Sequence, residues 1–271
     1  MMSNKIIADQ LAMIPGFENH HPLINPEQGA GMLNSLGELQ QAVAEQCGYA
    51  SISFSTLGID TALFSVIAMI KAWQLQESKT AKTEFVLIGD AKRFDNVRGQ
   101  IDFDLIVPAR KIKSIDRAWA RFNCGDNTAA VFLFPPEGID ISIADLRWIA
   151  DRVRFCGGLI VADSNVCRLM KQSGVAAAEI VDIFLLDLYP LFGLSGVPSV
   201  SERIALAASE QLSPFLPVPR LVLQDSLVRW SSDDDFPLSI GRTSAFGSNN
   251  FALLSLAIEL QLHLNDEDAD S

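Results

Sequence analysis

Apolar residues recur along this chain in short runs of strand length, and segments with apolar residues at helical spacing lie between these runs. The runs do not alternate with polar residues and are rich in β-branched side chains, which is typical of strands buried on both faces. Strands are predicted over Glu84–Ile88, Phe103–Val107, Ala129–Phe134, Gly158–Ala162, Asp182–Leu186 and Arg203–Leu206. Helices are predicted over Met32–Gln46, Thr61–Gln76, Ile141–Phe155 and Asn250–Leu264.

The alternation of strands with helices predicts an α/β fold, in which a mostly parallel central sheet is covered by helices on both faces. Ligands of such sheets bind at the carboxyl ends of the strands, so functional residues are expected in the loops that directly follow strands. Two short polar segments, Ser231–Asp235 and Asn265–Ser271, are expected to be a loosely held loop and a disordered acidic tail.

Composition narrows the possible functions. The net charge of −12 and the pI of about 4.6 describe an acidic surface, which repels phosphate backbones and anionic lipids, so nucleic-acid and membrane binding are not expected. The four cysteines are scattered without a CxxC pair, which fits reduced, buried thiols. The first residues lack a basic flank before an apolar run, and Thr61–Ile70 is too short to span a bilayer. A cytoplasmic protein is predicted.

Asp163 directly follows the apolar run Gly158–Ala162 and is the first candidate site residue. It could bind a ligand at the carboxyl end of a strand. The alternative, which the residues alone favour, is an Asx turn with Ser164 and Asn165 that closes the strand without any ligand. Both interpretations stay open at the level of the residues alone.

Other candidate sites have weaker patterns. The pair His20–His21 could bind a metal ion, but no cysteine or carboxylate cluster accompanies it, and a structural or surface role is the alternative. Ser195 and Ser199 have no recognisable histidine and aspartate partners, so a serine nucleophile is not expected.

Five segments in a fixed order carry a resemblance to a known family. They are His21–Trp73, Gly157–Ser164, Val181–Phe192, Ser213–Pro217 and Thr243–Leu260. Their motifs and spacing resemble the P-protein of the glycine cleavage system, a pyridoxal-phosphate (PLP) enzyme that decarboxylates glycine, and are closest to its lysine-bearing half. The resemblance implies a PLP-dependent transferase-like large domain over residues 21–264, after an extension over 1–20 and before an acidic tail over 265–271. The smaller C-terminal domain of the family is expected to be missing.

The resemblance assigns roles to residues around the cofactor. Asp163 aligns with the aspartate that binds the pyridine nitrogen and keeps the ring protonated. The lysine that forms the internal aldimine aligns with Pro190, between Tyr189 and Leu191. Proline has no side-chain nucleophile and cannot form an imine. Tyr189 remains a candidate cofactor-binding residue.

No other lysine replaces the missing one in the sequence. Lys171 is the last lysine of the chain, so a small error in the alignment does not recover a lysine near Pro190. Lys92, Lys111 and Lys113 fall in segments predicted to be loop or exposed helix.

The phosphate-binding turn of the family aligns with Gly58–Leu63 and is also altered. Ile59 replaces a glycine, and Asp60 would place a carboxylate near the phosphate, where a like-charge pair at roughly 4 Å costs on the order of 4 kcal/mol. Asp60 instead suits an N-cap of the helix predicted from Thr61. Thr61 is the cofactor-binding candidate that remains in this turn. The pocket histidine of the family falls within Asp90–Asn96 and is absent.

These losses predict a pseudoenzyme: a P-protein-like chain that keeps its fold, has no catalytic lysine, and binds pyridoxal phosphate at most weakly and not covalently. Its expected role is that of a structural or regulatory partner, in a homo-oligomer or in a hetero-oligomer with a lysine-bearing homologue. One alternative is a subunit that supplies Asp163 and Tyr189 to a composite active site for glycine or amino-acid decarboxylation. Another is a small-molecule binding module.

Overall fold

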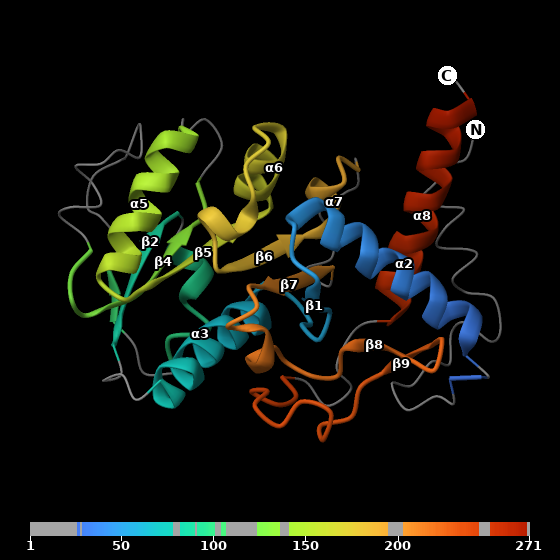
Figure 1. Ribbon diagram of the computed structural model, residues 1–271, viewed down its shortest axis with the longest axis horizontal. Coiled ribbons are helices and arrows are strands. Elements are labelled where there is room, and N and C mark those ends of the chain that lie inside the picture. Colours follow the sequence, from blue (N-terminus) through green and yellow to red (C-terminus); the bar gives the residue numbers. More distant parts are fainter. Residues whose placement is uncertain are drawn as a thin grey trace.

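A central sheet of seven strands organises the computed structural model of the chain, which describes residues 26–27, 29–77, 82–89, 91–100, 104–106, 124–135, 141–194, 203–243 and 250–269. The order of the strands is β1-β7-β6-β5-β4-β2-β3 (Figure 1). Their bounds are β1 Ser51–Ser53, β2 Glu84–Ile88, β3 Asp104–Ile106, β4 Thr128–Leu133, β5 Leu159–Asp163, β6 Ile183–Asp187 and β7 Ile204–Ala208.

Strand β7 is the antiparallel member of this sheet. It pairs antiparallel with β6 on one side and with β1 on the other, whereas the β6–β5, β5–β4, β4–β2 and β2–β3 pairs are parallel. Ile204 pairs with Asp187, so the start of β7 lies beside the carboxyl end of β6. The predicted mostly parallel α/β sheet is confirmed, and β7 delivers its first residues to the edge where ligands of such sheets bind.

Helices cover both faces of the sheet. Helices α5 (Ile143–Phe155) and α6 (Ser164–Gln172) lie on one face, and α3 (Ile59–Gln76) lies on the other (Figure 1). Helix α2 (Ala30–Cys47) joins the first face and packs against α8 (Asn250–Ala269). The shorter helical segments are η1 Ala91–Phe94, η2 Ala177–Glu179, α7 Leu188–Leu191 and η3 Ser213–Phe215.

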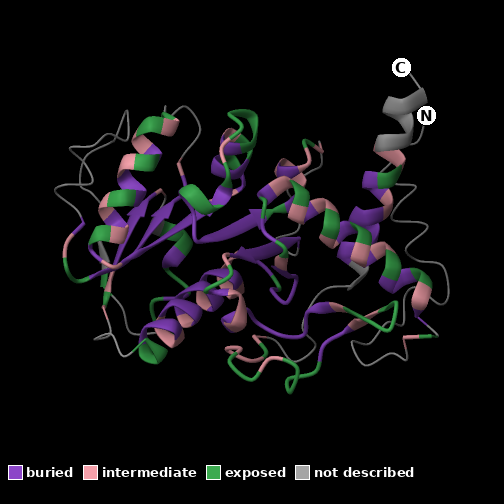
Figure 2. Ribbon diagram, viewed as in Figure 1, coloured by how far each residue is buried: buried purple, intermediate pink, exposed green. Residues whose placement is uncertain are grey.

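The two faces of the sheet bury separate hydrophobic clusters, as the purple strands and inner helix faces in Figure 2 indicate. Phe132 and Leu185 point into the cluster under α3, whereas Val131 and Leu186 point into the cluster under α2, α5 and α6. Successive residues of a strand face opposite sides, so strands buried on both faces need continuous apolar runs. All four cysteines are buried and none forms a disulfide, as predicted.

Most predicted elements match the structure within a few residues. Strand β2 has the predicted bounds, and α5 begins after the predicted N-cap Ser142, whose Oγ accepts a hydrogen bond from the Asp145 amide at 3.1 Å. The short strand β1 and helix α6 were not predicted from the sequence. A separate hairpin of β8 (Leu221–Gln224) and β9 (Leu227–Trp230) was not predicted either.

Two expectations about chain segments were wrong. Ser231–Asp235, expected to be loosely held, forms a defined turn. The Asp235 carboxylate accepts a hydrogen bond from the Ser232 amide at 2.6 Å and two from the Arg229 guanidinium, at 2.9 and 3.0 Å. Helix α8 continues through Asn265–Ala269, where a disordered tail was expected, because this stretch contains neither glycine nor proline to end it. Within the described residues, no helix combines the length and the apolar character that a membrane crossing needs.

Candidate functional site

The carboxyl ends of β5 and β6 lie side by side and end in two aspartates. Asp163 closes β5 and caps α6, since its Oδ1 accepts hydrogen bonds from the amides of Asn165 at 3.0 Å and Val166 at 3.2 Å. Asp187 closes β6 and caps α7 in the same way, through the Tyr189 amide at 3.2 Å. Ser164 Oγ donates to the Asp187 carbonyl at 2.9 Å and joins the two strand ends.

Both aspartates are held in an environment that opposes their charge. Burial raises the pKa of Asp163 to about 6, although the two capping amides and the guanidinium groups of Arg93 and Arg168 act in the opposite direction. Burial also raises the pKa of Asp187, although the hydrogen bond from the Tyr189 amide and the charges of Arg203 and Arg93 act to lower it. Desolvation disfavours a carboxylate, and here it outweighs the favourable contacts.

Two arginines from other elements complete this edge. Arg203 directly precedes β7, and only 8% of it is exposed. Its Cζ lies 4.4 Å from the centre of the Tyr189 ring, and its carbonyl accepts a hydrogen bond from the Leu188 amide. Arg93 belongs to η1, just beyond β2, and its Cζ lies 5.8 Å from the ring centre of Phe134, just beyond β4. The site therefore combines a half-buried carboxyl group, Asp163, and a more exposed one, Asp187, with cations stacked on aromatic rings.

Pro190 lies within α7, in the first turn after β6. A proline is tolerated there because the first turn of a helix has no partners for its amides. The neighbouring Tyr189 donates its hydroxyl hydrogen to Oε2 of Glu259 on α8 at 2.8 Å, and Glu259 itself is buried. The position that the resemblance gives to the aldimine lysine is thus part of a short, packed helical turn.

The start of α3 differs from the prediction. The helix begins at Ile59 and its N-cap is Gly58, whose φ of 140° favours glycine. Asp60 is therefore not the N-cap. It lies in the first turn and accepts a hydrogen bond from Asn96 Nδ2 at 2.7 Å. Thr61 Oγ1 donates to the Gly58 carbonyl at 2.9 Å.

A carboxylate in the first turn suits the positive end of a helix, and that is the place where a phosphate would bind. Asp60 puts a negative charge at this end of α3. The hydrogen of the Thr61 hydroxyl is already donated to the backbone. The turn that the resemblance assigns to the phosphate is therefore ill suited to a dianion.

The described lysines do not supply the missing amine. Lys82 precedes β2 and donates to the Cys156 carbonyl at the amino edge of the sheet, and Lys171 donates to Gln46 Oε1 at 2.7 Å near the end of α6. Lys71 lies in the second half of α3. Lys92 lies on η1 at the carboxyl edge, with an exposed side chain. Among the described residues, no lysine lies in the α7 turn, where the resemblance puts the aldimine lysine.

Several predicted residues lie outside the described part of the chain, namely His20, His21, Lys111, Lys113, Ser195 and Ser199. Among the described residues, no group of three or more His, Cys, Asp or Glu side chains could hold a metal ion. The sequence analysis named Asp163 and Tyr189 as candidates but did not name Asp187, Arg93 or Arg203, which lie at the same edge. The same pattern that identified Asp163, an aspartate directly after a buried strand, would have identified Asp187.

No family model matches the chain. It is 29% identical over 251 residues to the "Probable glycine dehydrogenase (decarboxylating) subunit 2" of Legionella pneumophila (strain Paris), covering 90% of this chain and 51% of that protein. The protein of the same name from Thioalkalivibrio sulfidiphilus is 27% identical over 271 residues, covering 97% of this chain and 53% of the relative. The chain thus spans about half the length of the curated relatives it matches.

Solved structures agree on the fold. The crystal structure of the glycine decarboxylase (P-protein) of the glycine cleavage system in inhibitor-bound form superposes with a TM-score of 0.65 at 16% identity, covering 95% of this chain and 59% of that one. A cysteine desulfurase from Thermococcus onnurineus gives a TM-score of 0.58 at 9% identity, covering 98% of this chain and 65% of that one. The resemblance to the P-protein that the sequence predicted is therefore confirmed, and this chain is P-protein-like in sequence and has the PLP-dependent transferase-like fold.

Proposed function

We propose that this chain is a catalytically degenerate, P-protein-like pseudoenzyme that acts as a structural or regulatory partner of a lysine-bearing homologue. The observation that carries the proposal is Pro190, which lies in the helical turn after β6, at the position where the resemblance puts the aldimine lysine. No imine can form on proline. The altered start of α3 at Asp60 supports the same conclusion, because the framework of the fold is kept while groups needed for the cofactor are replaced.

The partner is the more specific part of the proposal. The curated relatives are named as subunit 2 of a glycine dehydrogenase, and a numbered subunit has a companion. A hetero-oligomer with a P-protein-like subunit is the assembly that this naming supports, and a homo-oligomer is the alternative. Residues 21–264 are proposed to be the large domain that docks, and the cytoplasmic location remains a prediction.

The loss of covalent cofactor binding predicts a specific result with pyridoxal phosphate. When the purified chain is mixed with the aldehyde and treated with borohydride, we expect no stoichiometric reduced adduct at the carboxyl edge of the sheet. The absorbance band of an imine should be absent before reduction, and peptide mass mapping should find only trace labelling of exposed amines. Pro190 offers no amine, and Lys92 has an exposed side chain on η1.

The matched variant is Pro190→Lys, which restores an amine in the α7 turn and shows whether the assay can detect an imine there. Circular dichroism should first show that this variant folds. A stoichiometric, reducible adduct on the wild-type chain, at Lys92 or at any other residue of the edge, would overturn the pseudoenzyme proposal.

The partner proposal predicts a complex that can be isolated. Co-expression of this chain with a tagged lysine-bearing P-protein-like subunit should yield a defined complex by affinity capture and light scattering. A tagged cysteine desulfurase, whose fold is similar, serves as the control bait and should capture nothing. Equal capture by both baits, or a folded chain that stays free in both experiments, would contradict a specific partner role.

A second candidate function rests on the aspartates. Asp163 and Asp187 end neighbouring strands, and partial desolvation raises the pKa of each. Such groups are typical of functional sites, since a raised pKa lets a carboxyl group exchange a proton near neutral pH. We therefore keep the composite site as the alternative, with Asp163 and Tyr189 supplied to a partner's reaction. Decarboxylase activity that appears only in the complex and is lost with Asp163→Asn would favour it.

A further inference from the structure

An open groove lies between helix α2 and strand β8, and its volume is about 380 Å³. Helix α2 forms one wall, with Glu38 and Gln41 among its residues, and the consecutive residues Leu221–Leu223 of β8 form the other. Strand β9 adds Val228. Side chains of successive strand residues point to opposite faces, so three consecutive residues border one groove through the backbone edge of their strand. The groove therefore follows the edge of β8.

The turn between β8 and β9 fixes the direction of the backbone hydrogen bonds in the hairpin. Both residues of Asp225–Ser226 have positive φ, 51° and 68°, which is typical of a two-residue type I′ turn. The residues that flank such a turn, Gln224 and Leu227, form a hydrogen-bonded pair. Pairs alternate along an antiparallel ladder, so Leu223 and Val228 form a pair without hydrogen bonds. The N–H and C=O of Leu223 consequently point away from β9.

The other end of the hairpin shows the same alternation. The Ser231 amide donates to the Arg220 carbonyl at 2.7 Å, so this pair, four residues from Gln224 along β8, is again hydrogen-bonded. Leu221 therefore has outward backbone groups, as Leu223 does. Within the described residues, these outward groups form no hydrogen bond with another element. Strand β8 is an open strand edge.

This edge has none of the features that ordinarily protect one. Strand β8 reads Leu-Val-Leu-Gln, without a proline or a lysine. Leu223 is 74% exposed, although it is a large apolar residue. Val228 of β9, by contrast, packs on α2, where a Cβ added to Gly37 would lie 3.2 Å from its Cγ2. The hairpin is thus held to α2 through β9, and an apolar, unpaired edge borders the groove.

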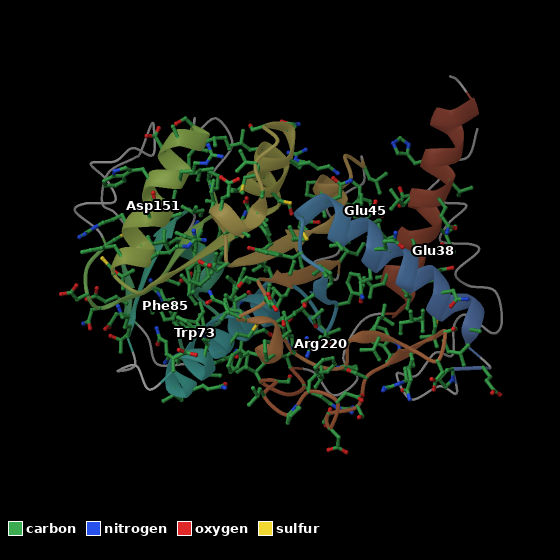
Figure 3. The ribbon with its side chains drawn as sticks, viewed as in Figure 1. Glu38, Glu45, Trp73, Phe85, Asp151 and Arg220 are labelled. Carbon is green, nitrogen blue, oxygen red and sulfur yellow. The ribbon has the colours of Figure 1, made fainter. Side chains whose placement is uncertain are left out.

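The wall that α2 contributes is acidic. Its charged residues are Glu38 and Glu45, both exposed, and the helix contains no lysine or arginine (Figure 3). Oε2 of Glu38 accepts a hydrogen bond from Gln261 at 2.6 Å, and within the described residues Oε1 has no hydrogen-bond partner. A second copy of this chain is a poor occupant, because its own β8 has no cation to pair with Glu38 and its net charge is also −12. A basic segment is complementary to this wall.

We propose that the groove binds an extended, basic segment of a partner protein, which adds a strand to the free edge of β8. The backbone of the segment bonds to the N–H and C=O groups of Leu221 and Leu223. Its apolar side chains cover Leu223, and a lysine or arginine pairs with Glu38. The groove shares no residue with the aspartate edge, and the proposal does not depend on the pseudoenzyme role.

Fluorescence anisotropy of the full chain with a labelled peptide, Val-Lys-Val-Lys-Val-Thr, tests this proposal. One control peptide has glutamate in place of both lysines, and another has every backbone nitrogen methylated, so it cannot donate hydrogen bonds to β8. We expect saturable binding of the basic peptide, with the acidic peptide weaker by about fivefold or more and the methylated peptide by about tenfold or more. Equal binding of the basic peptide and either control would overturn the proposal.

Leu223→Pro is the main variant. Proline removes the outward N–H and leaves the β8–β9 ladder intact, because this N–H does not bond to β9. It should weaken the basic peptide by about tenfold or more, whereas Leu223→Ala, the matched control that keeps the N–H, should weaken it by no more than about threefold. Glu38→Gln should weaken it by about two- to fivefold, and this variant remains informative if Leu223→Pro does not fold.

Light scattering at rising protein concentration distinguishes the occupants. The wild type should form no dimer through this edge. A dimer that Leu223→Pro dissociates and Leu223→Ala keeps would mean that a second copy occupies the edge, and it would overturn the proposal. Failure of the wild type to bind the basic peptide, or equal binding by the proline and alanine variants, would do the same.

Discussion

Replacement of Phe132 by alanine is expected to lower the free energy of unfolding by about 3–5 kcal/mol. Phe132 lies near the carboxyl end of β4 and is fully buried, in the cluster beneath α3. Its ring centre lies 5.1 Å from that of Phe94, 5.5 Å from that of Phe134 and 5.8 Å from that of Phe85. Alanine would remove these ring contacts and leave a cavity that a sheet buried on both faces cannot close.

Urea unfolding followed by circular dichroism measures this loss, and Phe155→Ala is the control. Phe155 is also a phenylalanine, but it lies at the end of α5 with 84% of its surface exposed, so its removal should change the free energy of unfolding by no more than about 0.5 kcal/mol. Equal losses in the two variants would show that Phe132 is not the centre of a packed cluster.

Asp163→Asn is expected to be more stable than the wild type above about pH 6. Burial raises the pKa of Asp163 to about 6, whereas an aspartate in an unfolded chain titrates near 4. Between these values the folded state binds more protons than the unfolded state, so the free energy of unfolding falls as pH rises and then levels off. Asparagine has no charge to desolvate, and its oxygen can still accept from the amides of Asn165 and Val166. The gain should be on the order of 2–3 kcal/mol.

Urea unfolding from pH 4 to pH 8 tests this second prediction. The difference between variant and wild type should grow between about pH 4 and 6 and stay constant above. Asp151→Asn, on the exposed side of α5, removes a carboxylate that is not buried and should follow the wild-type profile (Figure 3). A variant less stable than the wild type at pH 7 would mean that the Asp163 charge is stabilised in the fold. If the prediction is correct, the chain carries an aspartate at position 163 although its charge destabilises the folded protein. That result would favour a role for Asp163 in a composite site.

The central part of the fold was predictable because its strands are long and buried on both sides. Such strands leave continuous apolar runs, and β2 was found with its correct bounds. Strand β1 has three residues, Ser51–Ser53, and its partner lies far along the sequence, so it leaves no local pattern. The β8–β9 hairpin turns through Asp225 and Ser226, both with positive φ, and lacks the glycine that ordinarily marks such turns.

The candidate site was only partly predictable for a related reason. Asp163 could be found because it directly follows an apolar run. Arg203 could not, because an arginine is most often exposed and only the tertiary structure shows that this one is covered. The antiparallel direction of β7, which brings Arg203 beside Asp187, is also a property of pairing and not of composition.

The position of β1 has a consequence for biosynthesis. Ser51–Ser53 pairs with Leu206–Ala208, so the two strands are separated by roughly 155 residues. A ribosome that adds about 5–20 residues per second needs roughly 8–30 s to cover that distance. Throughout this interval β1 lacks β7, the strand with which it pairs. In the nascent chain, β1 therefore stays unpaired until β7 has left the ribosome. A chaperone that binds the segment around β1 would act during this time.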